Sequence, residues 1–192
     1  MKRPMMCVAG LVLAALPAFA DTTKPYAGFQ DRAVTSLSDG DLTSLRAGEG
    51  WGLALPAELN GYPGPKHVLE LAAELELSPE QTARVEAIFA EMRAEAIAAG
   101  QAFIDAEKAL DAGFSDGGLT AAALERLIAT AGEARAALRM VHLSRHLQMV
   151  EVLTSAQVER YVHLRGYTAD PCAAVPDGHD PEMWRRHNGC DG

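Results

Sequence analysis

The stretch LRMVHLSRHLQMVEVLTSAQVERY, from Leu138 to Tyr161, decides the fold of this chain. Its apolar residues recur every three or four positions as far as Leu153, which is typical of a helix with one buried face. Thr154 and Gln157 then fit a capping box, in which the Thr hydroxyl accepts from the Gln157 amide and the Gln side chain reaches back to the Thr154 amide. The stretch therefore predicts the end of one helix and the start of the next.

An earlier copy of this pattern, Leu77-Ser78-Pro79-Glu80-Gln81, precedes another long helical stretch. Ser78 and Gln81 form the second predicted box, and Pro79 occupies the first helical position, where its missing N–H costs nothing. In both copies a leucine, Leu77 or Leu153, stands just before the box and can pack onto the first turn that follows it. Two ordinary helix starts are the plain interpretation, but two boxes that bracket one pair of helices are a more specific signal.

We expect an all-α fold: a long antiparallel helical hairpin with a short helix at each end. The predicted helices are residues 66–76, 79–112, 121–152 and 155–164. Gly113, Ser115 and Asp116 to Gly118 make the turn between the two long helices. In that register Gly100 is expected to face Gly132, which favours close approach of the two helices or a shared bend; two tolerated glycines are the alternative.

Residues 1–20 have the pattern of a secretory signal, with Lys2 and Arg3 before an apolar core and Ala18-Phe19-Ala20 before the cleavage point. We expect cleavage after Ala20 and no stable membrane anchor, because the apolar run is too short to span a bilayer. Residues 21–65 are predicted to be an extended arm with a short helix over 42–46, ordered by packing Trp51 and its leucines on the hairpin. Disorder of the arm is the alternative.

The hairpin domain is predicted to cover residues 66–167 and a tail to follow at 168–192. Loss of Cys7 with the signal leaves Cys172 and Cys190, and an even pair in an oxidising compartment predicts a disulfide that closes the tail. Thiolate ligation of a metal is the alternative for these cysteines. His179, Asp180, Met183 and His187 form a weak candidate metal cluster in the same tail.

The net charge is −9, and removal of Lys2 and Arg3 with the signal makes it about −11. Nucleic acid is a poor partner for such a chain, because binding to phosphates rests on Lys and Arg. The sequence has no G-x-S-x-G, P-loop, Rossmann glycine set or H-E-x-x-H. We therefore expect a protein that is not an enzyme.

His142 and His146 stand four residues apart on the apolar face of a predicted helix, the spacing of two ligands to one metal ion. With Met149 on the same helix and Glu86 on the facing one, the set would suit Zn, Cu, Ni or Co. His67, Glu70 and Glu74 are further donors on the first helix. The alternative is two hydrogen-bonded histidines at a packing seam or dimer interface, and no cofactor is certain.

The pair of L-[ST]-x-x-Q motifs, the signal and the helix-rich chain resemble the Spy/CpxP family, known for its LTxxQ motif, and the periplasmic metal sensors and zinc-resistance proteins that share its fold. The resemblance covers residues 66–167 and implies a periplasmic location, a homodimer, and envelope-stress protection through ATP-independent holding of unfolded client proteins. In the related metal sensors a His-x3-His pair, a Glu and a further His or Met bind the metal, but there the pair lies on the first long helix.

Two alternatives to client holding stay open. One is a periplasmic heavy-metal sensor or resistance protein that uses His142 and His146 and signals to a periplasmic sensor partner. The other is an envelope interaction protein with neither activity, which would show a hairpin face fully covered by the N-terminal arm.

Overall fold

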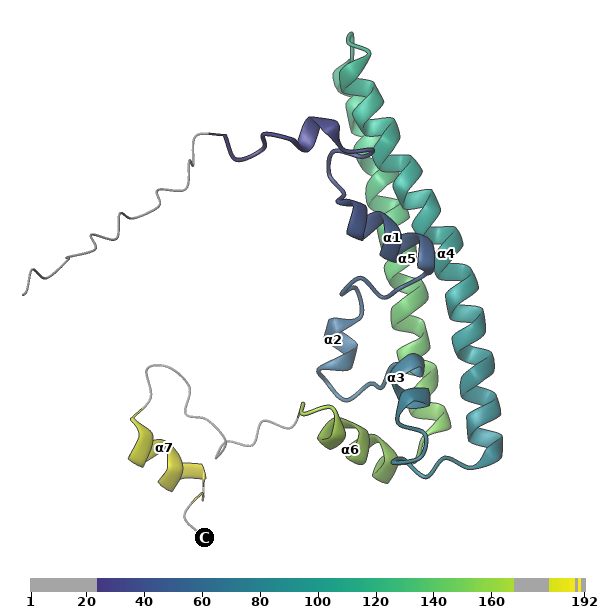
Figure 1. Cartoon of the computed structure of the whole chain (residues 1–192), viewed down its shortest axis with the longest axis vertical. Coiled ribbons are helices and arrows are strands. Elements are labelled where there is room, and N and C mark those ends of the chain that lie inside the picture. Colours follow the sequence, from purple (N-terminus) through teal and green to yellow (C-terminus); the bar gives the residue numbers. More distant parts are fainter. Residues whose placement is uncertain (1–23, 168–179, 189, 191–192) are drawn as a thin grey trace, which may run out of the picture.

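The computed structural model describes residues 24–167, 180–188 and 190, and in these parts it confirms the all-α fold (Figure 1). The elements are η1 (Phe29–Asp31), α1 (Asp39–Ala47), α2 (Leu55–Glu58), α3 (Pro65–Glu70), α4 (Pro79–Ser115), α5 (Ala121–Val152), α6 (Ser155–Leu164) and α7 (Pro181–Asn188). The predicted signal peptide lies outside the described residues. So does Cys172, and its pairing with Cys190 stays a prediction.

The two long helices α4 and α5 lie side by side and form a hairpin, which α1, α2 and α3 contact (Figure 1). The starts predicted at residues 79, 121 and 155 are confirmed, while α4 continues to Ser115, beyond the predicted residue 112. Gly117 and Gly118 follow with φ of 75° and 70°, a left-handed conformation that glycine adopts without strain. An ion pair of 2.7 Å between Arg145 of α5 and Glu95 of α4 joins the two helices at one level.

The helix α3 ends at Glu70, although the sequence predicted a helix to residue 76. Residues 71–76 continue as turns, and Glu76 has a left-handed φ of 52°. The helix cannot run on into α4 because Pro79 has no N–H to give to the carbonyl of Leu75, and a residue before proline avoids the helical conformation. The carbonyl of Leu75 needs another donor.

That donor is Gln157. Both predicted capping boxes are present, with Ser78 and Gln81 at the start of α4 and Thr154 and Gln157 at the start of α6. The two glutamine side chains also bond to each other: Nε2 of Gln81 donates to Oε1 of Gln157 at 2.9 Å, and the reverse bond measures 3.0 Å. The remaining donors go to the carbonyls of Val152 at 3.0 Å and Leu75 at 3.2 Å.

Each amide therefore uses its full hydrogen-bonding capacity. Each Oε1 accepts from the backbone N–H of its own N-cap residue, at 3.1 Å for Ser78 and 2.9 Å for Thr154, and from the other amide. Each Nε2 donates twice, once across the pair and once to a carbonyl left open at a chain reversal. We call this arrangement the glutamine pair; it fastens the base of the hairpin to α6.

Beside the glutamine pair, a cluster of buried residues fills the base of the hairpin. Its members come from α3, α4, α5, α6 and the turns between them: Val68, Leu75, Val85, Met149, Val152, Leu153 and Tyr161. Tyr161, the largest of them, is fully buried. Packing of this size gives α6 and α3 a fixed position under the hairpin.

The arm, residues 24–64, lies along one face of the hairpin and buries its own leucines there. Leu42, Leu45 and Leu53 share a buried cluster with Phe103 and Ile104 of α4, and Leu138 of α5 belongs to the same cluster. Trp51 packs against this cluster and donates from Nε1 to Asp41 at 2.7 Å. The predicted packing of Trp51 is thus confirmed, but Leu55 and Leu59 are exposed.

Polar contacts fasten the other end of the arm near the tip of the hairpin. The backbone N–H of Thr35 donates to Asp111 at 2.8 Å, and its hydroxyl donates to the same carboxylate at 2.5 Å. The hydroxyl of Ser36 donates to Glu107 at 2.6 Å. The arm is therefore held at the tip by carboxylates of α4 and farther down by apolar packing.

The predicted facing of Gly100 and Gly132 is wrong. A Cβ on Gly100 would lie 2.7 Å from the backbone oxygen of Leu45, so this glycine lets α1 of the arm approach α4 closely. A Cβ on Gly132 would meet no atom within 4 Å. The predicted antiparallel register did not say in which direction each glycine points around its helix.

The glutamine pair predicts a specific sensitivity to charge. Gln157→Glu keeps an oxygen that accepts from the Thr154 amide but removes both N–H donors. We expect the free energy of unfolding at pH 7 to fall by about 2–5 kcal/mol, because the carbonyl of Leu75 and Oε1 of Gln81 lose their donors and face a carboxylate.

Denaturant unfolding of the wild type, the Gln157→Glu variant and a control variant measures the change in the free energy of unfolding. The control is Gln30→Glu, an exposed position in the arm, for which we expect a change within about 0.5 kcal/mol. Equal losses in the two variants would contradict the role of the pair.

The two glycines predict opposite effects of the same substitution. Gly100→Ala places a methyl group against the backbone of α1 and should destabilise the fold by about 1–3 kcal/mol. Gly132→Ala, in open space, should be neutral or stabilising by up to about 1 kcal/mol, because alanine is the better helix former. Thermal unfolding measures both, and a Gly100→Ala protein as stable as the wild type would show that the arm does not pack there.

Candidate functional site

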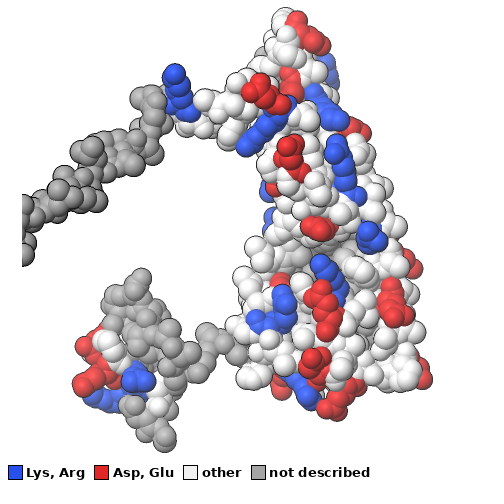
Figure 2. Space-filling model, in the orientation of Figure 1, with Lys and Arg blue, Asp and Glu red and all other residues white. Residues whose placement is uncertain are grey.

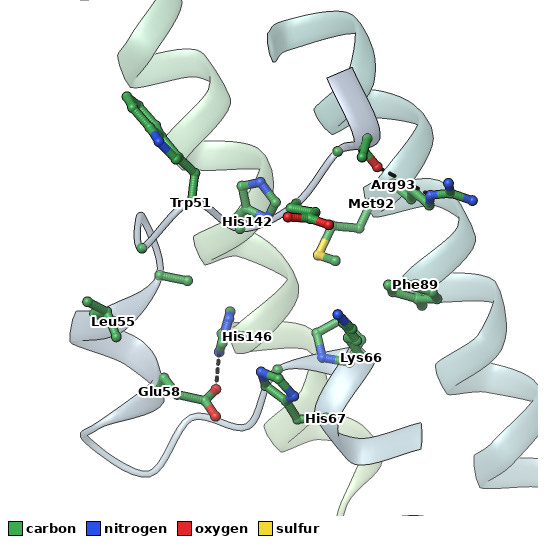
Figure 3. A pocket seen from close by; sticks show the side chains of 18 residues that line it. Trp51, Leu55, Glu58, Lys66, His67, Phe89, Met92, Arg93, His142 and His146 are labelled. Atoms are coloured by element: carbon green, nitrogen blue, oxygen red, sulfur yellow. Dashed lines mark hydrogen bonds and ion pairs between the residues drawn. The ribbon is translucent and has the colours of Figure 1, made fainter. Parts of the chain in front are cut away.

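A cavity of about 560 Å³ lies between the arm and the hairpin (Figure 3). The arm and α3 supply one wall, through residues 47–52, Ala54, Leu55, Glu58 and residues 64–67. The hairpin supplies the other wall, through Phe89, Met92 and Arg93 of α4 and His142 and His146 of α5. The cavity exists because the arm spans the hairpin at this level without filling it.

The two predicted histidines both line this cavity. His142 and His146 lie one helical turn apart on the buried face of α5, with exposed fractions of 3% and 6%. Their common direction follows from the four-residue spacing, which stacks side chains along a helix. The prediction that the pair shares an inward face is therefore confirmed.

His146 is oriented by the arm. Its Nδ1 lies 2.7 Å from the backbone oxygen of Tyr62 and 3.8 Å from the carboxylate of Glu58. The shorter contact is the hydrogen bond, and because a carbonyl can only accept, Nδ1 carries the proton and Nε2 the lone pair. Gly64 allows this approach, since a Cβ there would lie 3.0 Å from Cε1 of His146.

Glu58 is buried in the wall of the cavity and joins the arm to the end of α6. Its Oε1 accepts from the hydroxyl of Tyr161 and, at 3.0 Å, from that of Tyr167. Nε of Arg165 lies 3.5 Å from the same oxygen. Burial, followed by the hydrogen bond to Glu58, raises the pKa of Tyr161 well above its usual range, so this phenol stays a donor to the carboxylate.

His142 has a different environment. Burial lowers its pKa, and the nearby His146 adds to the effect, so His142 is held in its neutral form. Its Nε2 is buried and has no hydrogen-bond partner among the described residues. A buried polar atom without a partner is uncommon in folded proteins and marks a place where a ligand can bind.

The other expected donors are not all brought to the histidines. Met149 is buried in the cluster at the base of the hairpin, and Glu86 is exposed on α4 and does not line the cavity. His67 does line it, but its Nδ1 is 2.8 Å from Glu70. In residues 24–167, 180–188 and 190 no group of three or more His, Cys, Asp or Glu side chains is arranged to hold a metal ion.

The remaining candidates lie apart from the cavity or outside the description. Glu74 is exposed, and neither it nor Glu70 lines the cavity. Asp180 and Met183 of the tail lie at the start of α7, where Asp180 accepts from the backbone N–H of Met183 at 2.8 Å. His179 and the side chain of His187 are outside what the structure describes.

Sequence reasoning missed the residues that the arm contributes. Glu58, Tyr62 and Gly64 belong to the segment that was predicted to be an extended arm, and the helix α2 within it was not predicted. A buried glutamate has no periodic signature in a short helix. Met92, a buried residue of α4, lines the cavity as well.

The matches to known proteins bear on the hairpin and not on the arm. The sequence profile of the LTXXQ motif family matches residues 65–165, more than half of the chain. The chain belongs to the LTXXQ motif family. This confirms the Spy/CpxP-type resemblance and places the protein in a family of periplasmic proteins. No curated protein and no solved structure matches the chain.

The LTXXQ motifs correspond here to Leu77–Gln81 and Leu153–Gln157, which contain the glutamine pair. The cavity, by contrast, is built half from the arm, which precedes the matched residues. Among the described helices none is both long enough and apolar enough to cross a membrane.

The depressed pKa of His142 predicts a loss of stability in acid. Because the pKa of His142 is lower in the folded state than its ordinary value of 6.5, the unfolded state binds the proton more tightly. Stability is fully present above that value and falls as the pH drops through it. Thermal unfolding between pH 7.5 and 5 should show this decline for the wild type and a smaller one for His142→Leu.

His163→Gln, a change at an exposed histidine of α6, is the matched control and should follow the wild-type curve. A His142→Leu protein with the wild-type dependence on pH would show that burial of this imidazole is not what couples stability to pH.

Proposed function

We propose that this LTXXQ-family protein is a periplasmic envelope-stress protein that holds unfolded client proteins without ATP. The observation that carries the proposal is an exposed apolar row along α5, here called the outer row. Its members follow each other at steps of three or four residues, and all but the half-buried Leu143 are exposed: Ala129, Gly132, Ala136, Met140, Leu143, Leu147 and Val150. Met140 and Leu147 are 66% and 58% exposed.

The outer row is separate from the face of α5 that packs in the fold. The buried residues of α5 include Leu138, His142 and Met149, which at 100° per residue lie roughly a third of a turn away from the row. Exposed charges, Glu133, Arg139 and Glu151, flank the row. An apolar strip rimmed by charge is typical of a surface that binds other proteins.

The arm decides which surface is open to clients. It covers the face of the hairpin that contains Phe103, Ile104 and Leu138, so this face is not accessible in the described fold. This covered face is the signature expected of an interaction protein with neither activity. The outer row lies on another face of α5 and is not covered by the arm, and this uncovered surface supports client holding. Figure 2 shows Lys and Arg interspersed with Asp and Glu on one face of the molecule, so no field of a single sign dominates there.

The proposal includes secretion with cleavage after Ala20, which the signal pattern of residues 1–20 predicts, and a homodimer, which the family resemblance implies. Holding of clients by an exposed surface needs no catalytic group and no cofactor. Its partners are unfolded proteins, which supply apolar segments to the outer row.

Suppression of aggregation tests the proposal. Protein made with its own leader is recovered from the periplasm, its mass is checked for a first residue of Asp21, and light scattering of a heat-unfolded enzyme is followed in its presence. The double variant Met140→Glu/Leu147→Glu should need at least about tenfold more protein for the same protection, because each glutamate removes a large apolar contact.

The control variant is Leu59→Glu/Met183→Glu, because these residues are 55% and 67% exposed and lie outside the outer row. It should protect like the wild type. Sedimentation velocity on the same samples reports the oligomeric state. A row variant that becomes monomeric but protects fully would make the row an interface between copies and overturn its role in client binding.

Metal binding by His142 and His146 is a second candidate function, for which Zn, Cu, Ni and Co are the ions to consider. It is favoured by the convergence of the two imidazoles on one cavity and by the unpartnered Nε2 of His142. The two histidines fit a metal ion, while Met149 and Glu86 lie elsewhere, as described above. Calorimetric binding that disappears in His142→Ala/His146→Ala would support this candidate.

A further inference from the structure

The cavity offers the Nε2 atoms of two histidines to a ligand. The Tyr62 carbonyl holds the proton of His146 on Nδ1, at 2.7 Å, which leaves Nε2 as the free donor atom. A metal-binding histidine usually donates its other ring N–H to such a group, a backbone carbonyl, a carboxylate or a water. His142, 3% exposed, contributes an Nε2 that has no partner among the described residues.

Met92 supplies a third donor from the facing helix. It is a buried residue of α4 that lines the same cavity, and Figure 3 shows its side chain projecting into the space between the two long helices. Its thioether sulfur is a soft, uncharged ligand. Two imidazoles from α5 and one thioether from α4 are therefore the donors that the hairpin turns into this cavity.

The charged side chains around the cavity are balanced in sign, so the choice of ion depends on the donor atoms. Lys66 and Arg93 line it together with the two histidines. Glu58, the buried carboxylate in its wall, is engaged by Tyr161 and Tyr167 and is not a free ligand. The other carboxylate in the lining, Glu49, is exposed, as are Lys66 and Arg93.

We propose that His142, His146 and Met92 bind a soft monovalent metal ion, copper(I), for which silver(I) is the redox-stable substitute. This inference rests on the second candidate function and adds the class of ion and the third ligand to it. A neutral donor set of two nitrogens and one sulfur suits such an ion, because thioether ligands select copper(I) over borderline dications. No electron transfer is involved.

The arm completes the site without supplying a ligand. Through Tyr62 it fixes the tautomer of His146, and through residues 47–55 it covers the donors from water. Binding of the ion and docking of the arm should therefore stabilise each other.

Calorimetric titration of the full-length mature protein tests the inference. The protein is used with its cysteines oxidised, since a free thiol would bind silver. Silver(I), and anaerobic copper(I) in competition with a chromophoric chelator, are compared with Zn(II), Ni(II) and Co(II). We expect one silver or copper(I) ion per chain, with a Kd at least 100-fold lower than that of any dication.

Substitutions locate the site. Met92→Leu preserves side-chain volume and should raise the Kd for silver at least tenfold, whereas Met149→Leu, a change at a buried methionine in the base cluster, should leave it unchanged. His142→Ala should abolish binding, with far-UV circular dichroism to confirm that the variant folds. The ¹⁵Nε2 resonances of both histidines should shift on addition of silver.

Each outcome decides a separate point. Dications that bind more tightly than silver, with no effect of Met92→Leu, would overturn the soft-metal inference and leave metal binding by the histidines intact. No binding of any ion would overturn both. Silver binding that survives His142→Ala would place the metal elsewhere in the chain and also overturn the inference.

Discussion

The mutual hydrogen bonds of Gln81 and Gln157 are the interaction on which the rest of the structure depends. They join the first turns of α4 and α6, and they supply the donors for the carbonyls of Leu75 and Val152, where the chain reverses. Glutamate would serve in an isolated capping box, but it lacks the two donors that this arrangement uses. The glutamine in each LTXXQ motif therefore has a structural reason that a helix start alone does not give.

With the base fixed in this way, the arm makes the two faces of the hairpin different from each other. The arm covers one face through Leu42, Leu45 and Leu53 and leaves the outer row of α5 exposed. The same arm creates the cavity, since Glu58 and the Tyr62 carbonyl reach the histidines from it. The proposed client holding and the proposed metal binding would thus use different surfaces of α5, and neither would exclude the other.

Most of the fold could be predicted because helix starts and apolar spacing are local properties. The capping boxes and the inward direction of His142 and His146 follow from neighbours in sequence. What could not be predicted depends on rotation between elements. Glu86 and Gly132 were expected to face the opposite helix, but a predicted level along a hairpin does not say which way a residue points around its helix. Glu58 was missed because its burial comes from Tyr161 and Tyr167, more than one hundred residues away.

The glutamine pair also has a consequence for how the chain folds. Gln81 and Gln157 are 76 residues apart, while the turn at residues 116–120 is local. Contacts near the turn can form early, and the distant pair must wait until both long helices are complete, because closing a long loop costs entropy. A slip of one helical turn between α4 and α5 would separate the two amides by about 5.4 Å and leave four hydrogen-bonding atoms without partners. The glutamine pair therefore forms late in folding, and it stabilises only a hairpin in which α4 and α5 are in the correct register.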